Sequence, residues 1–339
     1  MLRHTLLILT VATLVVLAGC PKPTETTTPV APPEASAKTE TTPAAGETYT
    51  IAVVPKGMAY SFWKIVKAGA DAAGQEFGAK IEWKGPDQET DVARQKAIIE
   101  NFITAKVDAI VMAACDSKAL IDKVQQARTA GIPVITIDSG IDSNDALSFV
   151  ATDNVKGARE GTEKLIELVG GEGEIGCIPF IKGAATSDMR EQGFDEAVKA
   201  NPKAKAVKPL YSEGDAAKAM KAAENMMTSN PNLRGIFAAN EPGAIGAAQA
   251  IKQRGKAGEI KLVAFDAADA EINALKEGVI QALVVQDPFK MGYDGVRLAI
   301  DAIQGKEIED RVDTGVTLVT MDNFDDPEVQ KLLFPKIEE

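Results

Sequence analysis

Gly131-Ile-Pro-Val-Ile-Thr-Ile-Asp138 is the stretch of sequence that indicates most directly how the chain folds. Its β-branched run, residues 133–137, is short and apolar, which is typical of a buried strand rather than a helix. Gly131 and Pro133 mark a sharp junction with residues 117–130, whose apolar positions recur with helical spacing. A helix that runs directly into a buried strand indicates an α/β fold.

The same alternation continues on both sides of this segment. Helical spacing also recurs over residues 62–77 and 88–105. Strands roughly 25 to 30 residues apart leave room only for a crossover helix, so the sheets should be parallel and covered on both faces. After a hinge-like stretch at 149–154 the alternation restarts, which predicts two doubly wound lobes with a ligand cleft at the carboxyl ends of the strands. The expected strands are 49–54, 80–84, 108–113, 133–137, 174–179, 204–209, 235–238, 261–265 and 280–285.

The composition argues against several classes of protein. The chain has 339 residues, a formal net charge of −12 and one histidine, His4, which lies in the leader described below. The rest of the chain therefore has no imidazole for a serine–histidine mechanism or a zinc site. The acidic balance argues against a nucleic-acid partner. Cys115 and Cys177 fall in different expected lobes and are expected to be free thiols, and no cofactor or metal site is expected.

Residues 1–19 have the pattern of a secretion signal. Arg3 precedes a 14-residue apolar run, 5–18, and small residues lead to Cys20. The run is shorter than the about 20 residues that a transmembrane helix needs. Leu17-Ala-Gly-Cys20 resembles a bacterial lipobox, which implies that Cys20 becomes a lipidated first residue; a freely secreted protein is the alternative. Residues 20–48, rich in Pro and Thr, are expected to form a disordered linker.

Two kinds of side chain gather where the expected strands end. Tyr60, Phe62 and Trp63 follow the first strand in a chain with only 5% aromatic residues. Such rings cover the C–H face of a sugar, although they also serve to seal a helix against a sheet. Charged and amide side chains follow later strands and suit a neutral, polyhydroxylated solute, although Asp and Asn there also cap helices. They are Asp138, Arg190, Asn240, Asp266 and Gln286.

Around these residues the chain resembles the ribose-binding-like family of bacterial periplasmic sugar-binding proteins. The matching blocks, within residues 49–320, are GIPVITID at 131–138, SFVATDN at 148–154, GIFAAN at 235–240, LVAFD at 262–266 and Gln-Asp-Pro at 286–288. The resemblance implies a type I periplasmic binding fold, an α/β architecture of two doubly wound parallel-sheet lobes joined by a three-strand hinge. It also implies that each lobe is discontinuous. The N-terminal lobe would comprise 49–152 plus 287–314, and the C-terminal lobe 153–286 plus 315–339.

The resemblance further implies roles for individual residues. Phe62 and Trp63 would sandwich the sugar ring. Asp138 and Asp266 would accept protons from its hydroxyl groups. Arg190, Asn240 and Gln286 would complete a polar cage.

The chain departs from the ribose binders at four positions. Ser139 stands in place of an arginine, Ala113 in place of an asparagine, Gly214 in place of an aromatic residue, and Tyr60 at a polar position. Ser139 and Gly214 remove bulk, whereas Tyr60 and Trp63 add it near the opposite wall. We therefore expect a reshaped pocket for another sugar or polyol than ribose, with Ser139 among the residues that contact it.

These patterns favour a binding protein over an enzyme. We expect a monomer, lipid-anchored on the periplasmic side of the cell envelope, that captures a neutral sugar or polyol by hinge closure. It would deliver this solute to the permease subunits of an ABC transporter. One alternative is a sugar sensor that docks to a receptor. Another is a glycoside-acting enzyme that uses Asp138 and Asp266 as a carboxylate acid/base pair.

Overall fold

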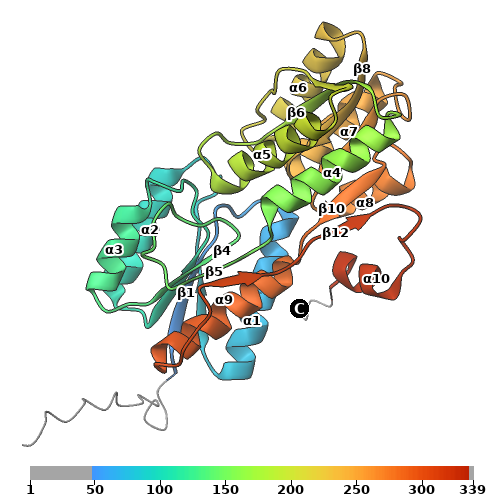
Figure 1. Cartoon of the computed structure of the whole chain (residues 1–339). Coiled ribbons are helices and arrows are strands. Elements are labelled where there is room, and N and C mark those ends of the chain that lie inside the picture. The colour runs from blue at the N-terminus through green and yellow to red at the C-terminus, as the bar shows by residue number, and fades with distance from the viewer. Residues whose placement is uncertain (1–47, 336–339) are drawn as a thin grey trace, which may run out of the picture. The chain divides into compact units, whose positions relative to one another are not determined.

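A computed structural model describes residues 48–335 of the protein (Figure 1). The secretion signal, Cys20 and nearly all of the expected linker lie outside the described residues. Among the helices of residues 48–335, none has the length and apolar character that a membrane crossing requires.

The first sheet contains six parallel strands in the order β11-β5-β4-β3-β1-β2. Alternate residues of its strands face opposite sides, as the pleat of a strand requires. Ile51 and Val53 pack under α1 and α9, whereas Ala52 and Val54 pack under α2 and α3. The strands are β1 (Thr50–Val54), β2 (Lys80–Trp83), β3 (Ala109–Met112), β4 (Val134–Ile137), β5 (Ser148–Ala151) and β11 (Arg311–Asp313), and the helices are α1 (Ser61–Phe77), α2 (Val92–Ala105), α3 (Ile121–Thr129) and α9 (Pro288–Ile303).

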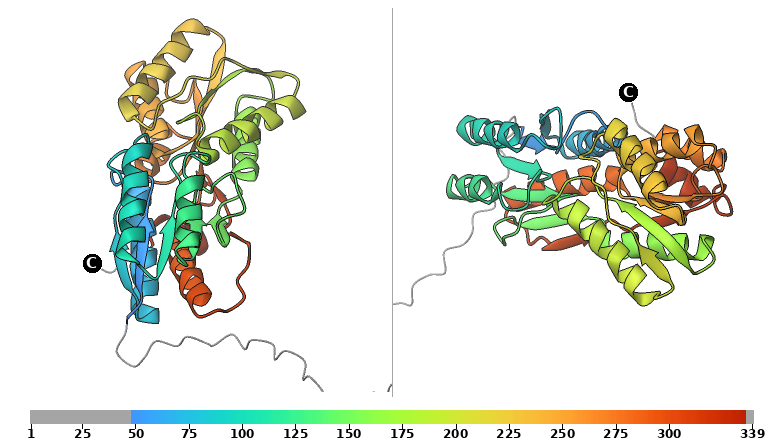
Figure 2. Two further views of the ribbon diagram at one scale, coloured as in Figure 1. Left: turned by 90° about the vertical axis from the view of Figure 1, so that its left-hand side faces the viewer. Right: turned by 90° about the horizontal axis from the view of Figure 1, so that it is seen from above.

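The second sheet has the order β12-β10-β9-β8-β6-β7 and is covered on both faces as well (Figure 2). One face packs against α4 and α5, and the other against α6, α7, α8 and α10. The strands are β6 (Gly173–Ile178), β7 (Ala204–Ala206), β8 (Leu233–Ala238), β9 (Lys261–Phe265), β10 (Ala282–Val285) and β12 (Thr317–Val319). The helices are α4 (Asn154–Leu168), α5 (Ala185–Ala200), α6 (Ala216–Ser229), α7 (Glu241–Gln253), α8 (Asp269–Lys276) and α10 (Pro327–Leu333).

The expected α/β fold of two doubly wound lobes is confirmed, and the structure corrects three details. The hinge-like stretch 149–154 begins inside strand β5, which pairs with β4 and β11. Strand β12 runs antiparallel to β10, so the second sheet is not wholly parallel. The strand expected at 204–209 ends at Ala206, and Pro209 lacks the N–H that a strand ladder needs. Cys115 and Cys177 are free, buried thiols, as expected.

The chain passes between the two sheets three times. It crosses after β5 at Thr152, after β10 at Gln286, and between β11 and β12 near Thr314. The first and third crossings lie together, because the Thr152 hydroxyl is 3.2 Å from the Gly315 carbonyl oxygen and 3.4 Å from the Thr314 hydroxyl. Each lobe is therefore built from pieces that are distant in the sequence.

The contact between α1 and α9 joins two such distant pieces of the first lobe (Figure 1). Two glycines allow the helices to approach closely. A Cβ atom on Gly292 would lie 1.9 Å from the Val66 carbonyl oxygen, and one on Gly69 would lie 2.0 Å from the Phe289 carbonyl oxygen. Near the C-terminus of α1, the carboxylate of Glu76 accepts a hydrogen bond of 2.6 Å from the Tyr293 hydroxyl of α9. The position of α1, whose first turn carries Phe62 and Trp63, thus depends on α9.

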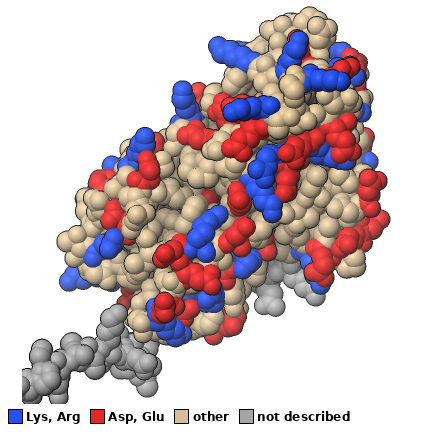
Figure 3. Space-filling model, viewed as in Figure 1, with Lys and Arg blue, Asp and Glu red and all other residues tan. Residues whose placement is uncertain are grey.

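Positive and negative side chains are mixed on the face of the molecule that Figure 3 shows. Lys and Arg are interspersed with Asp and Glu there, and no broad basic area appears on the described part of that face. Many charged side chains of the described residues form exposed ion pairs, such as Lys67–Asp71 and Lys252–Glu277. Exposed pairs of this kind contribute little to stability.

Candidate functional site

The strand ends of the two sheets meet around a small cavity of about 30 Å³. Eight of the nine ligand-binding residues expected from the sequence line it, whereas Ser139 does not. The lining residues come from both lobes. They are Lys56, Tyr60, Phe62, Trp63, Glu89, Asp138, Phe180, Thr186, Arg190, Asn240, Glu241, Pro242, Asp266 and Gln286.

Asp138 and Asp266 occupy equivalent places in the two lobes. Each is the first residue after a strand, β4 or β9, and each has a positive φ, 55° and 82° respectively. The backbone N–H of each donates to the neighbouring strand, to Val150 at 2.9 Å and to Val284 at 3.0 Å. Positive φ is unfavourable for most residues but less so for Asp, and such strain gathers at functional positions.

Lys56 connects the first lobe to the second inside the cavity. Its side chain is buried, with the ammonium nitrogen 2.9 Å from the Asp138 carboxylate. The same ammonium group donates to the Thr186 hydroxyl of α5 over 3.1 Å. It also lies over the rings of Trp63 and Phe180, 5.8 and 5.5 Å from their centroids. Burial alone would lower the pKa of Lys56, but Asp138 and Glu89 outweigh it, so the pKa is raised and the ammonium stays charged.

The aromatic wall differs from the sandwich that the resemblance implies. The Phe62 and Trp63 rings meet edge to face at 89°, with centroids 5.0 Å apart, so they do not face each other across a solute. The Trp63 indole N–H donates to Glu89 over 2.9 Å, which fixes its ring. Burial raises the pKa of Glu89, although Lys56 and this hydrogen bond oppose the shift. Phe180 of the second lobe supplies a further ring near the Lys56 ammonium group, which also lies near Trp63.

Arg190 is held rigidly in the second lobe. Its guanidinium group donates to Asn154 over 2.8 Å and to the Ala239 carbonyl over 2.7 Å. The group lies 3.8 Å from the centroid of the Phe265 ring, which is a cation–π contact. Burial lowers the pKa of Arg190, while Asp266 and Asp138 counteract this.

Asp266 holds together several polar residues of the second lobe by hydrogen bonds. Its carboxylate accepts the backbone N–H of Glu241 at 2.9 Å and the side-chain amide of Gln286 at 2.7 Å. The carbonyl oxygen of the Gln286 side chain is buried and has no hydrogen-bond partner among the described residues. Asn240 caps α7 by accepting the Gly243 N–H at 3.0 Å, and it also lines the cavity. Its contact with a solute stays a prediction. The second lobe thus has a buried acceptor without a partner on a residue that lines the cavity.

Two further contacts connect the lobes beside the cavity. The Tyr60 hydroxyl donates to the Gly214 carbonyl, and a Cβ at position 214 would lie 3.0 Å from that hydroxyl. The Glu241 carboxylate accepts the N–H groups of Ser61 and Phe62, each at 3.2 Å. An anion at this place is favourable because the first turn of α1 has unpaired N–H groups.

Ser139 is fully buried next to the site without reaching the cavity. Its N–H and carbonyl bond to the backbone of Ile137 and Ala114, and its hydroxyl has no partner among the described residues. Ala113 is likewise absent from the cavity lining, and its carbonyl accepts the Gln95 amide at 2.7 Å.

Sequence reasoning missed Lys56, Glu89, Phe180, Thr186 and Glu241. Lys56 follows the first strand by two residues, and Glu241 follows Asn240 directly. The expectation that binding residues stand just after strands could therefore have included both. Glu89 precedes α2, inside the range 88–105 that was expected to be helical, and Thr186 lies in the first turn of α5, so neither residue stands at the end of a strand. Their contacts with Trp63 and Lys56 become visible only in three dimensions.

A model of the periplasmic binding protein domain matches residues 51–307 of the chain. The chain belongs to the periplasmic binding protein family. It shares the type I fold of this family, in which two α/β lobes flank the cavity described above.

Relatives and solved structures agree with this membership. The D-ribose/D-allose-binding protein of Pseudomonas aeruginosa is 33% identical over 282 residues, which are 80% of this chain and 88% of that protein. A carbohydrate transporter solute-binding protein of Agrobacterium radiobacter, in complex with D-arabinose, has a TM-score of 0.82 and 38% identity, covering 85% of this chain and 99% of that one. An ABC transporter solute-binding protein of Agrobacterium vitis with bound D-fucose also has a TM-score of 0.82 and 38% identity, covering 84% and 100%. These relatives are binding proteins, so the chain is a binding protein and not the glycoside-acting enzyme considered above.

Proposed function

We propose that the protein captures a neutral monosaccharide or polyol between its lobes and delivers it to an ABC transporter. One observation carries this proposal: aromatic rings, carboxylates, amides and a guanidinium group from both lobes line one cavity. The named ligands of three relatives, ribose or allose, arabinose and fucose, are all neutral monosaccharides. The two Agrobacterium proteins are solute-binding proteins of transporters, which supports the delivery step.

The charges at the cavity favour a neutral solute. Lys56 is paired with Asp138, and Arg190 interacts with both Asp138 and Asp266. A charged solute would have to disturb these buried pairs, which is costly in a low-dielectric site. A sugar hydroxyl both donates and accepts, so it suits carboxylates, amides and a guanidinium group together.

Capture would require the lobes to separate and close again. A cavity of about 30 Å³ holds about two water molecules, far less than a sugar needs. We propose that residues 49–152 with 287–314 move as one lobe and 153–286 with 315–339 as the other. The three crossings between the sheets would act as the hinge, and solute contacts to both lobes would favour closure. Tyr60, which reaches Gly214 of the other lobe, supports a pocket shaped differently from that of ribose binders.

A solute panel tests this proposal directly. The full-length protein should gain thermal stability with one or a few neutral sugars or polyols, because a ligand of the folded state adds about 2.7 kcal/mol at a hundred times its Kd. The same solute should reduce the radius of gyration in X-ray scattering. Native mass spectrometry of protein purified without added sugar would identify a retained solute. No thermal shift across a broad panel, together with no retained solute, would overturn the proposal.

We also propose that the protein is lipid-anchored at Cys20 and exposed on the periplasmic side. The support is the Leu17-Ala-Gly-Cys20 pattern after an apolar run. Several acyl chains on one residue would give stable membrane attachment. The variant Cys20→Ser should move from the detergent phase to the aqueous phase in phase partitioning, whereas Cys115→Ser, which changes a buried thiol, should not. Unchanged partitioning of Cys20→Ser would contradict lipid attachment.

A further inference from the structure

Helix α1 differs from most of the other helices in how the N–H groups of its first turn are satisfied. These groups have no partner within a helix and need an acceptor from elsewhere. The side chain of an Asp or Asn at the N-cap supplies one in α2, α4, α6, α7, α9 and α10. The N-cap of α1 is Tyr60, whose side chain accepts no such bond, and the first turn of α1 has no acidic residue. The acceptor for α1 therefore has to come from another part of the chain.

The second lobe provides this acceptor. The carboxylate of Glu241, the first residue of α7, accepts the N–H groups of Ser61 and Phe62 at 3.2 Å each. We call this contact the interlobe cap. Glu241 is only 7% exposed, and its own N–H donates to Asp266 over 2.9 Å. One residue thus connects the first turn of α1, which carries two rings of the cavity wall, to the central carboxylate of the second lobe.

The interactions of Glu241 with its own lobe and with the first lobe have opposite effects on its charge. Burial raises the pKa of Glu241, and the negative charge of Asp266 in the same lobe raises it further, whereas hydrogen bonds from Phe62 and Ser61 lower it. The first lobe therefore stabilises the ionised carboxylate, as the positive end of a helix does. Because Ser61 and Phe62 belong to the other lobe, this stabilisation is present only while the lobes are together.

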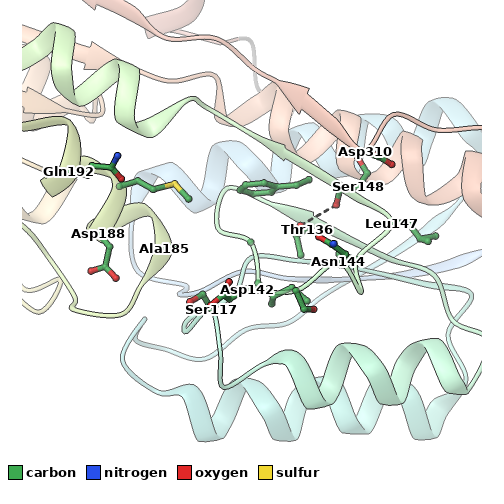
Figure 4. A pocket seen from close by; sticks show the side chains of 16 residues that line it. Ser117, Thr136, Asp142, Asn144, Leu147, Ser148, Ala185, Asp188, Gln192 and Asp310 are labelled. Carbon is green, nitrogen blue, oxygen red and sulfur yellow. Dashed lines mark hydrogen bonds between the residues drawn. The ribbon is translucent and has the colours of Figure 1, made fainter. Parts of the chain in front are cut away.

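Another part of the boundary between the lobes has no such contact. Figure 4 shows a groove of about 740 Å³ between the loop that follows β4 and helix α5. Asp142 and Asn144 lie on the side of the first lobe, and Asp188 and Gln192 on the side of the second. Among the described residues, none that lines this groove forms a hydrogen bond or an ion pair across it. Away from the hinge, the hydrogen bonds between the lobes of the described chain lie around the sugar cavity, and Glu241 accepts two of them.

We propose that Glu241 is a positioning residue for solute capture and acts through the interlobe cap. It holds the first turn of α1, with Phe62 and Trp63, against the second lobe when the lobes close, and so slows the release of the solute. A contact that exists only in the closed form favours that form by its full free energy. This inference rests on the proposed hinge closure and names the contact that maintains the closed form.

Stopped-flow binding to the full-length protein tests this role, followed by tryptophan fluorescence because Trp63 lines the cavity. The probe is whichever of D-allose, D-arabinose and D-fucose, the sugars named for relatives, gives the largest thermal shift. Glu241→Ala is expected to weaken binding about tenfold, because two hydrogen bonds to a charged group are lost and water replaces them only in part. The dissociation rate should account for this loss, with the association rate changed less than about twofold. The control Glu163→Ala, an exposed carboxylate on α4 of the same lobe, should leave both rates unchanged.

Ser61→Pro changes the other side of the interlobe cap. Ser61 is the first residue of α1, where proline fits well and where its missing N–H breaks no bond within the helix. Tyr60 before it has φ −87° and ψ 152°, the extended conformation that residues before proline prefer. Ser61→Pro should therefore keep the thermal midpoint of the unmodified protein and raise the dissociation rate about fivefold. In the Glu241→Ala protein, Ser61→Pro should have no further effect, because the acceptor is already absent.

Two results would overturn the role of Glu241. They are equal dissociation rates of Glu241→Ala and Glu163→Ala, and fully additive effects of Glu241→Ala and Ser61→Pro. X-ray scattering without solute separates this inference from the proposed function, because solute-free Glu241→Ala should have a larger radius of gyration than solute-free Glu163→Ala. If no sugar binds and this difference appears, the sugar function fails and the interlobe cap stands. If no sugar binds and the radii are equal, both fail.

Discussion

Asp266→Asn is expected to weaken sugar binding about a hundredfold, the largest effect of any single change at the cavity. The carboxylate accepts hydrogen bonds from the Glu241 backbone and the Gln286 amide. In the proposed complex this carboxylate also accepts a sugar hydroxyl, and the amide of Asn has no charge and one acceptor oxygen fewer for that bond. Hydrogen bonds to charged groups contribute about 1.5 to 3 kcal/mol each, and a loss of about 2.7 kcal/mol is a hundredfold in Kd. Calorimetry with the sugar identified by the panel measures this loss.

The matched control is Asp269→Asn. Asp269 is an exposed carboxylate in the first turn of α8, in the same lobe and three residues away. It should bind sugar as the unmodified protein does, and far-UV circular dichroism should show that both variants are folded. Equal sugar affinity of Asp266→Asn and Asp269→Asn would show that the solute does not contact this carboxylate.

Gly292→Ala is expected to lower the free energy of unfolding by about 3 kcal/mol. The added Cβ would lie 1.9 Å from the Val66 carbonyl oxygen and 2.9 Å from the Ala70 nitrogen. Both atoms belong to the backbone of α1, so no side-chain rotation relieves the clash and the two helices must separate. Overpacked cores typically lose about 1 to 3 kcal/mol, and a backbone clash lies at the upper end.

Urea unfolding followed by circular dichroism measures this loss, with Gln304→Ala as the control. Gln304 is the C-cap of the same helix, and its side chain makes no hydrogen bond among the described residues. Its substitution should change the midpoint little. A Gly292→Ala midpoint equal to that of Gln304→Ala would mean that α1 and α9 do not pack as closely as described.

The alternation of elements was predictable because it depends on local sequence. Buried parallel strands such as β4 are continuous apolar runs, and helices such as α1 carry an apolar stripe, so both are visible in short windows. Strands β11 and β12 were not predicted because each has three residues, too few for a pattern. The antiparallel direction of β12 follows from the third crossing between sheets, which is a property of the whole fold.

The end of a strand was the main sequence signal for the candidate site. Asp138, Asp266 and Gln286 follow strands directly, and parallel strands bring their carboxyl ends to one edge. Lys56 and Glu89 act through contacts with Asp138 and Trp63, and such pairings between distant segments have no local signal. The binding roles of all these residues remain the proposal that the sugar panel and the Asp266→Asn variant test.

Because the first lobe is discontinuous, it cannot complete its fold until most of the chain has been synthesised. Its sheet needs β11, and α1 needs α9, both of which come from residues 288–313. While a ribosome has yet to make this segment, the apolar faces of β1 and α1 have no permanent cover. Domains fold as units once their segments are present, so this lobe reaches its native state late. Such a delay suits the proposed periplasmic location, because a chain that has not yet completed its fold can still be threaded through a secretion channel.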